Sequence, residues 1–143
     1  MSDFFDSLDV SASALSAERL RMNVTSSNLA NAQTTRTPEG GPYRRKDAVF
    51  EARPFAEELA SQMNAPLHKV GVADVISDPN PPKMVYQPDH PDANTEGYVA
   101  YPNINTMEEM VNLITASRTF EANVTVINTT RNMMNKALDI GRR

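Results

Sequence analysis

Thr106-Met-Glu-Glu-Met-Val-Asn-Leu-Ile-Thr-Ala-Ser-Arg-Thr-Phe120 begins a run of 35 residues, Thr106 to Ile140, that contains neither proline nor glycine. Mostly apolar side chains recur in it every seven residues, in two rows offset by three and four positions, so on an α-helix they form one seam. The first row is Leu113, Phe120, Ile127 and Met134, and the second is Met110, Ser117, Val124, Arg131 and Leu138. The pattern predicts one long helix.

The residues at both ends agree with this helix. Thr106 and Glu109 have the spacing of a capping box, in which the hydroxyl and the carboxylate each bond a free amide of the first turn. Gly141 is a typical residue at a helix end. At about 1.5 Å per residue the helix is roughly 50 Å long, more than a compact chain of this size can bury. The seam therefore needs a partner of similar length, from this chain or from another copy.

A second helical pattern, thinner in apolar residues, runs from about Asp3 to Ala32. Its apolar row also repeats every seven residues, at Leu8, Leu15, Met22 and Leu29. Serine and alanine occupy much of the neighbouring surface, which lets another helix approach closely but leaves the isolated helix unstable. We expect this row to pack against the first row of the C-terminal helix. A plain two-helix hairpin within one domain is the alternative, which the helix lengths disfavour.

The middle of the chain is repeatedly interrupted. All ten prolines and four of the five glycines lie between Pro38 and Pro102. Short β-prone runs stand between these breakers, and none is long enough to anchor a large sheet. The runs are residues 48–50, 70–76, 83–86 and 98–101. Residues 54–66, which include 55–59, are expected to form a short helix or mobile loop.

These patterns predict a mainly α fold with a small β-rich middle. The long N- and C-terminal helices are expected to pair as a coiled coil, and a Pro-rich, partly extended β segment connects them. We divide the chain into residues 1–34, 35–104 and 105–143, with the first and last segments forming one discontinuous helical domain.

Composition excludes several classes of function. Acidic residues exceed basic ones by four, and residues 38–102 hold that excess with ten acids and six bases. A nucleic-acid partner is not expected from this balance. The chain has no cysteine, so disulfides and thiolate sites are excluded. Residues 1–6 lack the pattern of a secretory signal peptide, and no transmembrane segment is expected because no stretch approaches about 20 apolar residues.

His68 and His90 are the candidates for a metal site. Both are predicted in loops beside prolines and polar residues rather than at the helical spacing of paired ligands, so we interpret them as solvent-exposed. Glu51, Glu57 and Glu58 could pair for acid–base chemistry, but carboxylates in a polar segment usually form a solvated face. We predict no catalytic residue, no metal and no cofactor, and hence no enzyme.

Val24-Thr-Ser-Ser-Asn-Leu-Ala-Asn31 resembles the signature that ends the N-terminal helix of bacterial flagellar axial proteins, the rod, hook and hook-associated subunits. Asn28, Leu29, Ala30 and Asn31 carry the motif. Residues 109–123 and 128–134 resemble the matching C-terminal signature. Residues 41–46, 70–74 and 97–102 resemble the proximal-rod subunits in particular, and the segment 50–69 departs most, being longer than usual.

The resemblance implies a structural subunit of the flagellar proximal rod, which assembles into a helical drive shaft around the export channel and transmits torque. It implies contacts with the rod proteins FlgB, FlgF and FlgG, the rod-base protein FliE, the MS-ring and other copies of the chain. It also implies a place in the basal body, in the periplasm-spanning rod, reached through the flagellar type III apparatus without a cleaved signal peptide.

The seam residues are then the expected assembly interface: Leu8, Leu15, Met22, Leu29, Met110, Leu113, Phe120, Val124, Ile127, Met134 and Leu138. Asn28 and Asn31 are expected to fix the bend after the N-terminal helix, and Ser117 and Arg131 to set register at a cost in stability. The alternative function is a soluble coiled-coil adapter or a secretion-chaperone-like binding module. A metal-dependent enzyme is a distant third.

Overall fold

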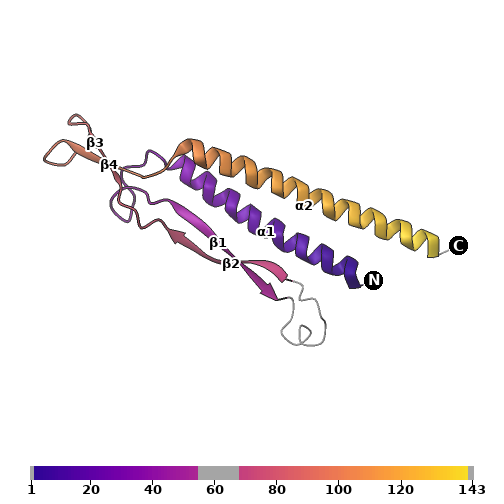
Figure 1. The fold of residues 1–143 in the computed structure, drawn as a ribbon. Helices are drawn as coiled ribbons and strands as arrows, with labels where there is room; N and C mark the ends of the chain where they lie inside the picture. The colour runs from indigo at the N-terminus through magenta and orange to yellow at the C-terminus, as the bar shows by residue number, and fades with distance from the viewer. Residues whose placement is uncertain (1, 55–67, 142–143) are drawn as a thin grey trace.

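The computed structural model describes residues 2–54 and 68–141. Two long helices lie side by side, and two small sheets lie along one helix and beyond one end of the pair (Figure 1). The elements are α1 (Ser2–Ala30), β1 (Lys46–Pro54), β2 (His68–Ser77), β3 (Lys83–Tyr86), β4 (Tyr98–Tyr101) and α2 (Thr106–Gly141).

Both predicted helices are confirmed, with 29 residues in α1 and 36 in α2. They run antiparallel, so the start of α1 and the end of α2 lie at the same end of the molecule (Figure 1). The long partner that the C-terminal pattern requires is therefore present in the same chain. No helix in the described residues is both long enough and apolar enough to cross a membrane.

β1 and β2 form an antiparallel pair from Lys46↔Ser77 to Pro54↔His68, with a register shift at Val49/Phe50. This pair packs against α1, which thereby lies between α2 and the sheet (Figure 1). The amide of Val70 donates to Ser13 Oγ at 3.1 Å. Lys69 pairs with Asp9 at 3.0 Å.

Both strands are longer than the sequence runs that predicted them. Backbone pairing with β2 extends β1 over charged residues that have little strand propensity of their own. Propensity alone could not predict this extension. His68 is consequently the first residue of β2, and its prediction as a loop residue is wrong. The short helix or loop predicted at residues 55–59 lies outside the described residues.

β3 and β4 coincide with two predicted runs and form a separate antiparallel hairpin. Val99 points into the protein and is fully buried. Gly97, just before β4, has a φ of +81°, in a region that residues with a Cβ rarely adopt. A Cβ built there would lie 2.9 Å from Tyr86 Cε2, so the Tyr86 ring rests directly on this glycine.

The buried apolar set is small. Among the described residues it consists of Ala17, Val99, Pro102 and Ala116, and the buried polar residues are Ser11, Thr25, Asn28, Glu109 and Thr130. Small side chains therefore dominate the most buried positions of α1 and α2, as close helix approach requires. Most large apolar residues remain at least partly exposed, which a stable isolated domain usually avoids.

The start of α2 differs from the predicted capping box. Asn105, not Thr106, caps the helix: its Oδ1 accepts the amide of Met107 at 3.2 Å, and its carbonyl accepts the amide of Glu109 at 3.0 Å. The Glu109 carboxylate is turned away from the helix end because it has partners elsewhere in the fold. Local spacing gave no sign of those partners.

Candidate assembly interface

Asn28 joins three elements near the end of α1. Its side chain mimics a strand neighbour: Nδ2 donates to the carbonyl of Lys46 at 2.8 Å, and Oδ1 accepts the Lys46 amide at 2.9 Å. Nδ2 also donates to Glu109 Oε2 at 3.1 Å. The residue is 1% exposed, so it ties the first residue of β1 and the first turn of α2 to α1. A buried amide with its donors and acceptor satisfied specifies one arrangement.

Glu109 completes this junction with Arg45. The Arg45 Nε donates to Glu109 Oε1 at 2.7 Å, and its Nη1 lies 3.3 Å from Asp47 Oδ2. Glu109 is 1% exposed. Burial lowers the pKa of Arg45, but the hydrogen bond and charge of Glu109 outweigh it, and the pKa is raised. The guanidinium therefore stays charged, and its stabilising effect is lost only as pH rises through that raised pKa.

Tyr43 and Asn31 hold the loop that leaves α1. The Tyr43 hydroxyl donates to Asn28 Oδ1 at 3.1 Å and also contacts Ser27 Oγ at 3.3 Å. Asn31 Nδ2 donates to the carbonyl of Ser27 at 2.9 Å, and its Oδ1 accepts from the Thr34 hydroxyl at 3.2 Å. Both motif asparagines thus contact the chain where it turns out of α1. We call Asn28, Tyr43, Arg45 and Glu109 the junction cluster.

A second contact fixes the alignment of the helices farther along. The guanidinium carbon of Arg19 lies 6.0 Å from the centre of the Phe120 ring, within cation–π range. From the Asn28–Glu109 contact this is nine residues back along α1 and eleven forward along α2. Two contacts so spaced hold the helices in one antiparallel register.

The predicted first row faces the protein. Its four residues are half-buried, and so are the four apolar residues of the N-terminal row. These residues are Leu113, Phe120, Ile127 and Met134 on α2, and Leu8, Leu15, Met22 and Leu29 on α1.

The predicted second row is not the other half of this seam. Ser117 is half-buried, but Met110, Val124, Arg131 and Leu138 are exposed. Buried residues of a different row take that place: Glu109, Ala116 and Thr130. The reason is that α1 approaches α2 on the side with short or internally paired side chains, leaving the second row on the flank. Whether those flank residues bind another subunit stays a prediction.

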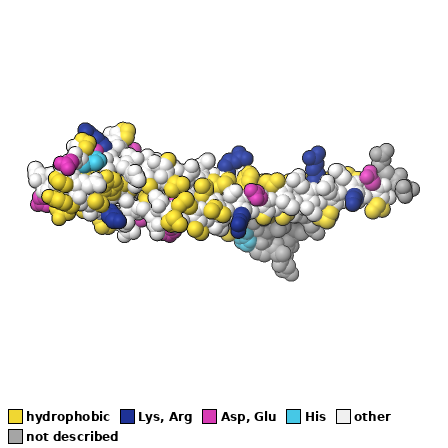
Figure 2. Space-filling model, turned by 90° about the horizontal axis from the view of Figure 1, so that it is seen from above, with side chains coloured by type: hydrophobic (Ala, Val, Ile, Leu, Met, Phe, Trp, Pro, Cys, Tyr) yellow, Lys and Arg dark blue, Asp and Glu magenta, His cyan; other side chains and the backbone are white. Residues whose placement is uncertain are grey.

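The face of α2 directed away from α1 carries further exposed apolar side chains: Met107, Val111, Ile114, Val126, Met133 and Ile140. Figure 2, which looks down on α2, shows hydrophobic side chains spread along the helix. The threonines of this helix add to that character, because Thr115, Thr119, Thr125 and Thr129 each bond the carbonyl four residues earlier. Their hydroxyls are satisfied within the helix, so contact with another helix leaves no donor unpaired.

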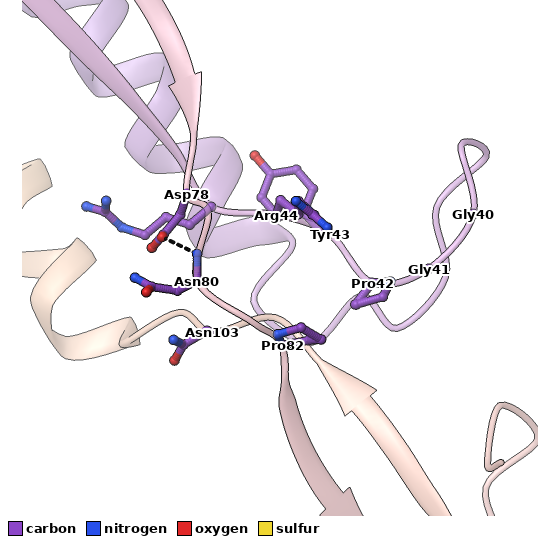
Figure 3. Close-up of a pocket in the computed structure, with 10 residues that line it drawn as sticks. Gly40, Gly41, Pro42, Tyr43, Arg44, Asp78, Asn80, Pro82 and Asn103 are labelled. Atoms are coloured by element: carbon purple, nitrogen blue, oxygen red, sulfur yellow. Dashed lines mark hydrogen bonds between the residues drawn. The ribbon is translucent and has the colours of Figure 1, made fainter.

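A pocket of about 140 Å³ lies between the loop at Gly40–Arg45, the turn at Asp78–Pro82 and Asn103 (Figure 3). Its one carboxylate, that of Asp78, already accepts the amide of Asn80 at 2.9 Å. His90 is half-buried in a turn, where its Nδ1 accepts the Asp92 amide at 3.1 Å. No cluster of three or more histidine, aspartate or glutamate side chains suited to a metal occurs within residues 2–54 and 68–141.

Comparison with known proteins accounts for both ends of the chain. Residues 8–36 match the family described as "Flagella basal body rod protein", and residues 95–140 match "Flagellar basal body rod FlgEFG protein C-terminal". The chain is 46% identical to the flagellar basal-body rod protein FlgC of Bacillus subtilis, over 96% of this chain and 98% of the relative. This chain belongs to the FlgC family. The FlgC proteins of Yersinia enterocolitica and Borreliella burgdorferi are 45% and 43% identical over similar shares.

Membership in the FlgC family confirms the motif-based resemblance. Asn28 of that motif is a member of the junction cluster. The sequence analysis missed Arg45 and assigned Glu109 to a cap. Two features of the sequence could have indicated these residues. Arg45 lies in a segment that resembles the proximal-rod subunits, and Glu109 begins the C-terminal signature. FlgC relatives are named as rod proteins, which favours a structural role over the adapter alternative.

Proposed function

We propose that this chain is a structural subunit of the bacterial flagellar proximal rod. In this role it assembles with other rod proteins into the helical drive shaft around the export channel and transmits torque. Its similarity to FlgC proteins over nearly the whole length supports the proposal. The role requires no catalytic residue, metal or cofactor, and we propose none.

The observation that carries the proposal is the amount of apolar surface left on α2 after α1 has packed against it. Residues on two sides of α2 stay exposed, including Val111, Ile114 and Leu138. Apolar patches of this extent mark protein–protein contacts. Contact of these exposed faces with further helices would extend the assembly. A contact between unlike surfaces generates an open helical array when the rotation from copy to copy does not close into a ring.

We assign the assembly interface to the two rows named from the sequence. The exposed second row, Met110, Val124 and Leu138, is proposed to contact neighbours directly. The half-buried residues, such as Phe120 and Leu15, are proposed to support that surface by holding α1 against α2. In this arrangement Arg131 stands on the exposed flank, where it can set the register with a neighbour rather than within the chain.

The partners that we propose are FlgB, FlgF, FlgG, FliE, the MS-ring and further copies of the chain. The proposed location is the periplasm-spanning rod of the basal body, reached by flagellar type III export without a cleaved signal peptide. Family membership supports these assignments.

Mass spectrometry of basal bodies purified from the native bacterium tests the proposal. The chain is expected there, with at most its initiator methionine removed, and in stoichiometric amounts with other rod proteins. Recovery only in the cytosol, as a compact monomer or a closed soluble oligomer, would support the adapter alternative instead.

A further inference from the structure

The β3–β4 hairpin presents a rigid aromatic side chain to solvent. Tyr86 is 63% exposed, yet its ring contacts Gly97 and stands edge-on to Tyr98, with ring centres 5.3 Å apart and planes at 67°. An exposed side chain that is already held in place loses little conformational entropy on binding. Such tyrosines are typical anchors of protein interfaces.

The rest of this hairpin face is apolar as well. Met84 and Ala100 are paired across the strands next to Tyr86 and Tyr98, so the four side chains share one face. Met84 is 52% exposed. The opposite face carries the buried Val99, so the hairpin has an inner face that packs on the protein and an outer face that does not. We call Met84, Tyr86, Tyr98 and Ala100 the hairpin knob.

A shallow hollow of about 390 Å³ lies on the flank of α2, lined by Leu113, Ile114, Ser117, Arg118 and Glu121. Leu113 and Ile114 supply its aliphatic part, and Ile114 is 54% exposed. Arg118 and Glu121 supply one charge of each sign at its border. The hollow has room for a tyrosine ring, and it lies beside the exposed second row of α2.

Charge complementarity connects the two surfaces. The loop between β3 and β4 contains Asp89, Asp92 and Glu96 and has no lysine or arginine. When the knob lies in the hollow, these carboxylates are attracted to the Arg118 guanidinium and repelled by the Glu121 carboxylate. The charges therefore select one orientation of docking, as complementary charges at interfaces do.

We infer that the hairpin knob of one copy docks into the α2 hollow of a second copy, with the acidic loop beside Arg118. The hairpin projects beyond the start of α2 and away from that helix (Figure 1), so the knob and hollow of one copy do not meet. Two unlike surfaces of one chain form a heterologous contact, which passes from copy to copy and builds an open helical array where the rotation between copies does not close into a ring. This inference rests on the proposed function and names the surfaces by which adjacent copies meet.

The absence of cysteine makes disulfide trapping unambiguous. Met84→Cys, which leaves Tyr86 in place, and Ser117→Cys are made in separate copies and co-expressed in the native bacterium. Basal bodies are then oxidised and the linked peptides identified by mass spectrometry. We expect a bridge between positions 84 and 117. The control pairs Met84→Cys with Thr129→Cys, twelve residues or about 18 Å along the same helix, and should give no bridge.

The outcomes separate this inference from the proposed function. Basal bodies that contain both variants but yield no 84–117 bridge overturn the inference and leave the rod assignment standing. An 84–84 bridge, or a bridge to another protein, also overturns it, because the contact would then be symmetric or have a different occupant. Absence of the chain from basal bodies overturns both.

A charge exchange gives an independent test of the orientation. Arg118→Glu is expected to abolish the 84–117 bridge, and adding Glu96→Arg is expected to restore it. A bridge that persists unchanged in Arg118→Glu would overturn the proposed placement of the acidic loop.

Discussion

The Nε of Arg45 lies 2.7 Å from the carboxylate of Glu109, and this ion pair joins the segment before β1 to the first turn of α2 across 64 residues of sequence. Asn28 holds the other oxygen of the same carboxylate from α1. The junction cluster therefore sets where the two helices begin their contact.

Glu109→Gln is expected to destabilise the free chain markedly. Removing one partner of a buried ion pair typically costs about 3 to 5 kcal/mol, and the partial exposure of Arg45 places the expected loss at or below the lower end. Urea unfolding followed by circular dichroism measures the change. Glu108→Gln, at the exposed neighbouring position, is the matched control and should change stability by less than about 0.5 kcal/mol. Equal effects in both variants would contradict the assigned role of Glu109.

Asn28→Asp is expected to weaken the fold in a pH-dependent way. The introduced carboxylate keeps the acceptor for the Lys46 amide but replaces the donor to Glu109 with a second negative charge. Repulsion from the neighbouring Glu109 carboxylate disfavours the ionised form of the introduced carboxyl group and so raises its pKa. A raised pKa gives stability that is lost as pH rises, so this variant should be closer to wild type near pH 5 than near pH 8. Melting temperatures at both values test this, and a deficit independent of pH would contradict it.

Phe120→Asp is expected to block incorporation into the rod while leaving export intact. Phe120 is half-buried against α1 and contacts Arg19. Truncating a fully buried phenylalanine costs about 3 to 5 kcal/mol, so truncating the half-buried Phe120 is expected to cost less, and a charge there adds a desolvation cost. Swimming assays and basal-body blots measure the effect. His90→Ala, in a turn remote from the seam, is the control and should remain motile. A motile Phe120→Asp strain would contradict the proposed seam.

Gly97→Ala is expected to disturb the hairpin knob more than Gly40→Ala disturbs its own loop. Both glycines have a positive φ, at +81° and +91°, so alanine is strained at either site by about 1 to 2 kcal/mol. Only at Gly97 does the new Cβ also meet a neighbour, the Tyr86 ring. Chemical shifts of the Tyr86 ring protons should change in Gly97→Ala and stay constant in Gly40→Ala. Unchanged shifts in both would show that Tyr86 is not held by the glycine.

Amide exchange should be slowest near the junction cluster and fastest at the far end of α2. Residues 109–116 begin and end with the buried Glu109 and Ala116, whereas nearly all residues from 131 to 141 are exposed. Hydrogen exchange followed by mass spectrometry of the free chain measures the gradient, because exposed helix ends open locally. Uniform protection along α2 would indicate that the monomer already covers the whole helix.

The extent of both helices could be predicted from the sequence because helix formation depends on local features. The absence of proline and glycine and the seven-residue rows place α2 to within one residue of its observed end. The four β-prone runs likewise marked all four strands, although β1 and β2 extend farther because pairing recruits residues with little preference of their own.

The junction cluster could not be predicted in the same way. Glu109 has the spacing of a cap residue, and a local argument assigns it to the nearest amides. The Arg45 guanidinium, 64 residues earlier, and the Asn28 side-chain amide, 81 residues earlier, bind the Glu109 carboxylate instead. They do so because a buried charge requires a partner. The position of the second row on the exposed flank of α2 could not be predicted for a related reason: periodicity identifies apolar rows but not the side from which a partner approaches.

The sequence by itself thus determined the elements, their order and, through its motifs, the family, because propensity, periodicity and motif all act over short separations. Only the tertiary structure decided which face of α2 meets α1, which residues join the three segments at Asn28, and which apolar rows stay exposed. Those outcomes depend on contacts between residues distant in sequence. Each such contact exists only when the whole chain has adopted one register.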